Sequence, residues 1–195
     1  MRSARNDTLV DAGLLLIRRK RREDALDDFR WRRDPEIARF DGSEPLSSTF
    51  SRYLRGVDYD LHFVDPRRQV FALESPEGVH FGNIMYYNAD GDSAEIGICV
   101  ALADYRDRGM GTVAMVAFVR YLWNTLVVRE LYLHTLEWNE RARNSFARAG
   151  FEETTRVLRD PHVFIRMEAR REWWLLHDME GRFPSADQAR RISNE

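Results

Sequence analysis

The chain of 195 residues is long enough for one ordinary domain, and its 44% hydrophobic and 12% aromatic residues are enough for a single core. Thirty basic and 32 acidic side chains give a formal net charge of −2, which excludes the strong basic field expected of a dedicated nucleic-acid binder. Cys99 is the only cysteine, which excludes an intramolecular disulfide and a cysteine-based zinc cluster.

After a polar leader at residues 1–12, the first half of the chain predicts one strand, two helices and three further strands. The strands are expected at residues 13–19, 69–74, 79–87 and 94–101. The first helix should end near Asp34, because the residue before a proline is pushed out of the helical region. Ser47 is expected to cap the second helix, which runs to about Leu54 after an irregular loop. The last three strands form an antiparallel meander.

The second half of the chain predicts two helices and three strands. One helix is expected at residues 111–126, where apolar residues form a stripe, and the other runs from Asn139 to Gly150. The strands are expected at residues 131–136, 151–158 and 162–169. The domain therefore covers residues 13–169, followed by a helical tail at 170–195. The fold class is α/β (α+β), a mixed sheet of about seven strands with about four main helices.

The location of the protein is predicted from what the chain lacks. The first ten residues are polar and charged, without the apolar core of a signal peptide. No apolar stretch reaches the length needed to span a bilayer. With a single cysteine, a reducing cytoplasm is the natural home. We therefore expect a cytoplasmic protein with neither a membrane nor a nucleic acid as partner.

A glycine-containing loop joins the strand at residues 94–101 to the helix that follows. Gly109 and Gly111 let the backbone turn tightly and leave its amides unobstructed, while the helix start adds unpaired N–H groups and a positive dipole end. Such a loop suits a phosphate group. It is neither a P-loop nor a dinucleotide fingerprint, because the required lysine and third glycine are absent. By themselves, the two glycines would equally fit a tight strand-to-helix turn.

Two motifs in this order carry a resemblance to a known superfamily. The first, Arg106-x-x-Gly109-x-Gly111, resembles the pyrophosphate loop of the GNAT N-acetyltransferases. The second resembles their N-x-x-A-x-x-x-[YF]-x-x-x-G-F segment and consists of Asn139, Ala142, Phe146, Gly150 and Phe151. The opening of the domain is similar to the branch that acetylates ribosomal proteins (alanine or serine termini) and small molecules such as polyamines and amino sugars. The resemblance covers residues 14–169.

The resemblance implies a mostly antiparallel sheet that is splayed between its fourth and fifth strands. It also implies transfer of an acetyl group from acetyl-CoA, as cosubstrate and without a metal, to an amine acceptor. The residues that it assigns to acetyl-CoA binding are Cys99, Val100, Ala101, Arg106, Asp107, Arg108, Gly109, Met110, Gly111, Thr112, Asn139 and Phe146. The loop amides and the Arg106 side chain would hold the pyrophosphate.

The catalytic residues are predicted with alternatives. A backbone amide near Val100 would donate to the thioester oxygen. The candidate general bases are Glu95, His134 and Glu137, each of which also fits an ordinary structural role. Phe146 stands where many members have a tyrosine that protonates the departing thiolate, and it cannot do so. Since a thiolate with a solution pKa of about 8.5 is a tolerable leaving group, this departure does not exclude catalysis.

Two questions stay open at the level of sequence. The loss of the hydroxyl at Phe146 mildly favours a rival hypothesis, a non-catalytic acyl-CoA-binding or sensor domain. The acceptor amine is not identified, although an acidic rim could attract a cationic one. This rim would consist of Asp34, Glu36, Asp41, Glu44, Asp58 and Asp60, which equally fit ordinary surface charge. Trp173 and Trp174 are expected to pack the tail onto the domain, with a homodimer interface as the less favoured reading.

Overall fold

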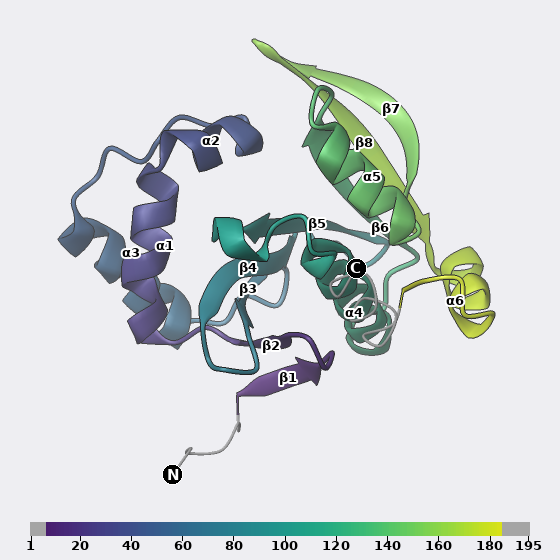
Figure 1. Cartoon of the computed structure of the whole chain (residues 1–195), viewed down its shortest axis with the longest axis horizontal. Coiled ribbons are helices and arrows are strands. Elements are labelled where there is room, and N and C mark those ends of the chain that lie inside the picture. The colour runs from purple at the N-terminus through teal and green to yellow at the C-terminus, as the bar shows by residue number, and fades with distance from the viewer. Residues whose placement is uncertain (1–6, 185–195) are drawn as a thin grey trace.

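A computed structural model describes residues 7–184, which form one sheet of eight strands flanked by helices (Figure 1). The strand order is β1-β2-β3-β4-β5-β6-β8-β7. The strands are β1 (Thr8–Asp11), β2 (Leu16–Arg19), β3 (Gln69–Glu74), β4 (His80–Tyr87), β5 (Ser93–Val100), β6 (Glu130–Leu136), β7 (Glu152–Arg159) and β8 (His162–Arg170). The mixed α/β prediction is confirmed, with one strand more than expected because part of the assigned leader forms β1.

All neighbouring strands are antiparallel except β5 and β6, which are parallel. Their pairing covers only Ser93–Glu95 of β5 against residues 130–132 of β6. Beyond Glu95 the two strands diverge, and the rest of β5 has a partner only on its β4 side. The predicted splay is therefore confirmed (Figure 1).

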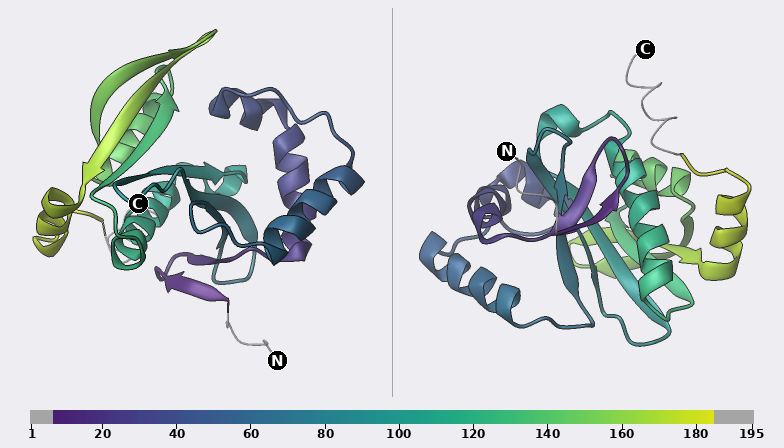
Figure 2. Two further views of the ribbon diagram at one scale, coloured as in Figure 1. Left: turned by 180° about the vertical axis from the view of Figure 1, so that it is seen from behind. Right: turned by 90° about the horizontal axis from the view of Figure 1, so that it is seen from below.

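Six α-helices surround the sheet within the described residues. They are α1 (Ala25–Arg33), α2 (Pro35–Asp41), α3 (Phe50–His62), α4 (Met110–Thr125), α5 (Glu140–Arg148) and α6 (Arg171–Met179). Figure 2 shows α1–α3 on one side of the strands and α4 with α6 on the other. Helix α6 lies within the segment expected to form a helical tail, and residues 185–195 lie outside the described residues.

The segment between the first two predicted helices is only partly an irregular loop, because α2 occupies residues 35–41 and only residues 42–49 are irregular. Pro35 does end α1, as expected, but its fixed φ also suits the first turn of a new helix. The Asp34 side chain caps that turn by accepting a hydrogen bond from the Glu36 amide at 2.8 Å. The cap at Ser47 was also wrong: Thr49 caps α3, which continues to His62.

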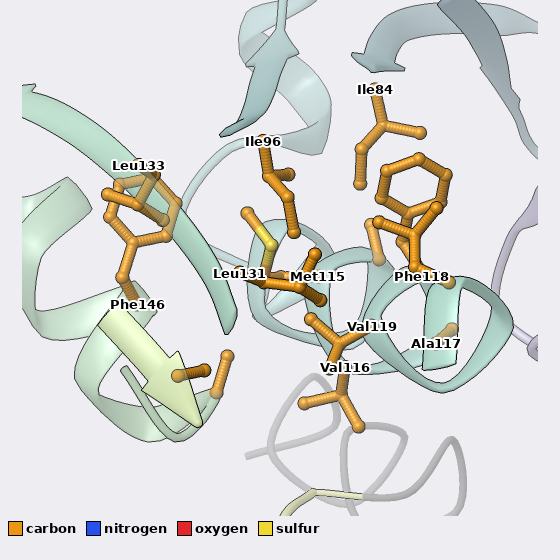
Figure 3. Close-up of a cluster of buried hydrophobic side chains, with 14 of the residues drawn as sticks. Ile84, Ile96, Met115, Val116, Ala117, Phe118, Val119, Leu131, Leu133 and Phe146 are labelled. Carbon is orange, nitrogen blue, oxygen red and sulfur yellow. The ribbon is translucent and has the colours of Figure 1, made fainter. Parts of the chain in front are cut away.

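The core lies between the sheet and α4. Ala94 and Ile96 of β5 belong to it, together with most of the buried face of α4 (Figure 3). Since successive strand residues alternate between faces, Glu95, Gly97 and Cys99 point to the opposite face, on the side of α1–α3. This alternation separates a packed face from a face available for chemistry.

The tail packs onto the domain through one of its two tryptophans. Trp174 is fully buried and donates from Nε1 to Ala149 O at 2.8 Å, while its ring stacks on Phe183. Trp173 stays 40% exposed and stacks on His177. The expected packing of the tail therefore depends on Trp174.

Candidate active site

The loop after β5 has the backbone geometry that its glycines suggest. Gly109 adopts φ 72°, in the left-handed region, and forms the N-cap of α4. The first helical hydrogen bond runs from Val113 N to Gly109 O at 3.0 Å. The amides of residues 110–112 therefore have no helical acceptor and lie at the positive end of the α4 dipole. This is the arrangement that binds an anion.

The packing around Gly111 does not require a glycine. A Cβ at this position would lie 3.7 Å from Ser145 Oγ and 3.9 Å from Val100 Cγ2, which are ordinary contacts. The neighbouring Thr112 hydroxyl lies 2.8 Å from the Ser145 hydroxyl and links the start of α4 to α5. A small side chain at Gly111 should therefore leave the loop intact, which makes this position suitable for a test of ligand binding.

The splay leaves backbone groups of β5 free on one side. Ala101 N donates to Phe81 O at 2.9 Å, so the antiparallel alternation directs the backbone groups of Cys99 toward β4. Those of Ile98 and Val100 point the other way, into the gap where β6 has left β5. The N–H of Val100, assigned above to the thioester oxygen, is on this open side.

Arg106 turns its guanidinium toward the end of β5. Its Nε donates to Val100 O at 3.0 Å and its Nη2 to Ala101 O at 2.6 Å. Its Nη1 pairs with Glu36 Oε1 of α2 at 3.0 Å, and only 14% of the side chain is exposed. These contacts occupy the side chain that the resemblance assigns to the pyrophosphate.

Two of the three candidate bases, Glu95 and His134, form a buried pair on the face away from α4. Glu95 Oε1 lies 2.6 Å from His134 Nδ1, and its Oε2 accepts from Asn88 Nδ2 at 3.2 Å. The side chains of Glu95 and His134 are 7% and 9% exposed. Because a carboxylate oxygen faces Nδ1, we assign the ring proton to that nitrogen.

The other ring nitrogen of His134, Nε2, has no hydrogen-bond partner in the described part of the chain. This nitrogen is not fully buried, so solvent can reach it. Arg159 Nη2 lies 3.3 Å from His134 Nδ1 and adds a positive charge beside the pair. The third candidate base, Glu137, instead pairs with Arg156 at the surface. In a neutral ring with its proton on Nδ1, Nε2 is the nitrogen that can accept a proton.

Negative charge surrounds two side chains near this pair. Burial, together with the field of Glu95, raises the pKa of Tyr87, which lies opposite Glu95 in the β4–β5 register. Burial and the Asp41 carboxylate raise the pKa of Cys99 to about 11. Cys99 is therefore a thiol at neutral pH, which argues against a nucleophilic role.

The expected acidic rim is mostly used within the chain. Asp34 caps α2, and three other carboxylates pair with arginines: Glu36 with Arg106, Asp58 with Arg22 and Asp60 with Arg68. Among the described residues, Asp41 forms no ion pair or side-chain hydrogen bond, and its field reaches both Cys99 and Tyr87. Asp41 is thus the rim residue best placed to attract a cation.

The two residues of the second motif that are assigned to acetyl-CoA, Asn139 and Phe146, also have structural roles. Asn139 is the N-cap of α5 and accepts from Ala142 N at 3.2 Å. Phe146 is 9% exposed and packs in the core near Leu133 (Figure 3). Neither position excludes a contact with the ligand, so both assignments stay predictions.

Sequence reasoning missed three features of the site: Tyr87, Asn88 and helix α2. The strand prediction placed Tyr87 at the end of its strand, but only the β4–β5 register sets it opposite Glu95. Asn88, with φ 54°, lies in the connection that follows, and no motif marks its side chain as a partner of Glu95. No pattern in α2 showed that this short helix would reach Arg106 and the opposite half of the sheet.

Comparisons with known proteins agree with this fold. A family model described as an acetyltransferase (GNAT) domain matches residues 15–152. Spermidine N-acetyltransferase from Vibrio cholerae, solved with CoA and spermine, superposes with a TM-score of 0.76 at 18% identity, covering 84% of this chain and 99% of that chain. Aminoglycoside acetyltransferase AAC(6')-Ib with coenzyme A gives a TM-score of 0.70 at 19% identity and the same coverage. A search of curated protein sequences found no match.

Two kinds of feature are absent from residues 7–184. No helix is both long and apolar enough to cross a membrane. No group of three or more histidine, cysteine, aspartate or glutamate side chains is arranged to hold a metal ion.

Proposed function

The chain belongs to the acetyltransferase (GNAT) family, and we propose that it transfers the acetyl group of acetyl-CoA to a primary amine by direct attack. The observation that carries this proposal is the combination at the splay of an open strand edge, an amide-lined loop and a proton acceptor. These groups come from β5, the start of α4 and β6, the three elements that border the splay.

The acetyl-CoA side of the site uses main-chain groups. The amides of residues 110–112 at the start of α4 would bind the pyrophosphate, helped by the helix dipole. The open edge of β5 would pair with the pantetheine chain through the backbone of Val100, which faces the gap, whereas the backbone of Cys99 faces β4. The Val100 amide would then donate to the thioester oxygen as charge develops there, an interaction that in other enzymes contributes about 10²–10³ in rate.

The amine side of the site uses the Glu95–His134 pair. With its proton held on Nδ1 by Glu95, His134 would accept the proton of the attacking amine at Nε2. The need for this base depends on the acceptor, because a lysine-like amine of pKa about 10.4 is neutral in only roughly one part in two thousand at pH 7. Asp41 would attract such a cation to the face that carries the pair.

The leaving thiolate would depart without a tyrosine. Phe146 has no hydroxyl, and its ring packs in the core. With a thiol pKa of about 8.5, the coenzyme thiolate is close enough to neutral pH to leave unaided. Positioning of the two reactants therefore supplies most of the remaining catalysis.

The test combines binding with turnover. Calorimetry should show micromolar-range binding of acetyl-CoA, and thiol release should be measured with spermidine, an aminoglycoside, an amino sugar and a peptide with a free N-terminus. The first two acceptor classes follow from the neighbouring structures, and the others from the resemblance. Binding without thiol release from any amine would instead support the non-catalytic acyl-CoA-binding domain.

The phosphate site is tested separately at Gly111. Gly111→Glu should abolish acetyl-CoA binding, because it places negative charge beside the loop amides. Gly111→Ala and Gly111→Gln are the matched controls, since the structure leaves room for a Cβ there. If Gly111→Glu binds as well as Gly111→Gln, the phosphate site has been misplaced.

The homodimer stays a prediction, which light scattering would test.

A further inference from the structure

Arg106 is the residue whose contacts differ most from its expected role. If the Arg106 side chain bound a diphosphate, its guanidinium should face the same space as the amides of the loop. Instead, all three nitrogens of Arg106 have partners within the protein: Val100 O, Ala101 O and Glu36 Oε1. With 14% of the side chain exposed, little of the guanidinium remains for a ligand.

Arg106 holds the end of β5 by donating to the carbonyls of Val100 and Ala101. Val100 O and Ala101 O lie beyond the last strand pairing to β6, so no neighbouring strand on that side holds them. The planar fork of arginine can donate to both at once, which a lysine cannot reproduce. Val100 O shares its peptide plane with Ala101 N, which donates to Phe81 O, so Arg106 and β4 together hold the peptide that directly follows the Val100 amide.

Glu36 connects the same guanidinium to α2. Glu36 is in the first turn of α2, whose other end reaches the opposite half of the sheet. There, Phe40 packs on Trp138 with ring centroids 5.4 Å apart, and a Cβ at Gly42 would lie 2.8 Å from Phe164 Cζ. Helix α2 therefore crosses from the loop after β5 to β8, on the face that carries Glu95 and His134.

We infer that Arg106 is a positioning residue that aligns the end of β5 for acetyl transfer and, through Glu36, fixes α2 on the acceptor side. This inference rests on the proposed acetyl transfer and assigns no contact between Arg106 and the diphosphate. It predicts that Arg106 acts on turnover and acceptor binding rather than on affinity for CoA.

Arg108 provides a matched control in the same loop. It is exposed and, within residues 7–184, forms no ion pair or side-chain hydrogen bond. Its guanidinium is thus free for a phosphate, whereas that of Arg106 is not. The two arginines lie two residues apart and should respond to substitution in opposite ways.

The experiment compares Arg106→Ala, Arg106→Lys, Arg106→Gln, Glu36→Gln and Arg108→Ala with the parent. Calorimetry gives the Kd for CoA, thiol release gives kcat and the acceptor KM, and thermal melting shows that each variant is folded. For Arg106→Ala and Arg106→Lys we expect kcat to fall by about 10–10²-fold, because small misplacement of reacting groups costs this much. The Kd for CoA should change by less than about threefold.

The remaining variants separate the fork from the charge. Arg106→Gln should recover part of the lost kcat, since one amide group can donate to one of the carbonyls. Glu36→Gln should raise the acceptor KM by only about two- to fivefold, because the Glu36 side chain is 64% exposed and solvent weakens its pairing with Arg106. It should do so with kcat and CoA affinity nearly unchanged, and because Glu36 is exposed this variant stays informative if Arg106→Ala folds poorly.

The opposite pattern would overturn the inference. If Arg106→Ala weakens CoA binding more than tenfold at unchanged saturated kcat, while Arg108→Ala does not, Arg106 is a diphosphate ligand. Full recovery of kcat by Arg106→Lys would also contradict it, because the charge would then suffice. A parent that neither binds CoA nor releases thiol refutes the proposed function itself, whereas an active parent with a changed CoA Kd in Arg106→Ala refutes only this inference.

Discussion

Substitution of His134 tests the proton acceptor most directly. His134→Ala removes Nε2, the proposed proton acceptor, and leaves Glu95 bonded to Asn88. The base contributes by removing a proton from the protonated amine, and a lysine-like amine is almost fully protonated at pH 7. The neutral fraction of roughly one part in two thousand limits the contribution of the base to about 10³-fold. At about pH 9.4 a tenth of the amine is already neutral, and the contribution falls to about tenfold.

Glu95→Gln distinguishes the two members of the pair. If His134 is the base, a neutral amide can still accept from Nδ1–H, and only the charge of the hydrogen bond is lost. Charge-assisted and neutral hydrogen bonds differ by about 1–1.5 kcal/mol, which corresponds to about a tenfold loss of kcat. If Glu95 is itself the base, the same substitution should cost about 10²–10⁴-fold.

The assay is thiol release with one accepted amine at saturating acetyl-CoA from pH 6 to 10, with thermal melting of each variant. Glu137→Gln is the matched control, because Glu137 was the third candidate base and its carboxylate pairs with Arg156 at the surface. We expect its kcat to equal that of the parent. A loss in Glu95→Gln that exceeds the loss in His134→Ala, or a loss that does not shrink as the pH rises, would refute the assignment of His134.

Three further predictions test the placement of β5 and α5. Gly82→Ala should destabilise the fold by about 2–4 kcal/mol in chemical denaturation, because the new Cβ would lie 2.2 Å from Cys99 O; wild-type stability would disprove this close approach. With a pKa of about 11, Cys99 should react with iodoacetamide about tenfold faster for each pH unit from 7 to 10, and acetyl-CoA should slow it; no protection would place the ligand elsewhere. Phe146→Tyr should change turnover by less than about tenfold and lower the melting temperature, because the hydroxyl enters the core; a large gain in thiol release would show that thiolate departure limits the parent.

The sequence by itself determined the elements and the loop that define the family. Apolar runs at strand period, the stripe of the α4 segment and the glycines at 109 and 111 are local signals, and local signals survive without tertiary contacts. The same holds for Asn139, which caps α5 in the structure as the pattern suggested. The splay followed from the family resemblance, not from any residue pattern.

Tertiary structure decided which of the plausible chemical residues come together. Glu95 and His134 are 39 positions apart in the sequence. They meet only because β5 and β6 lie side by side as far as Glu95, the last residue of β5 that pairs with β6. Arg106 could equally have faced a ligand or the backbone, since the motif fixes its position in the chain but not the direction of its side chain. Helix α2 could not be predicted from the sequence for a related reason. Its seven residues are too few to show a helical period, and its ends are held by contacts with Arg106 and Trp138, which are distant in sequence.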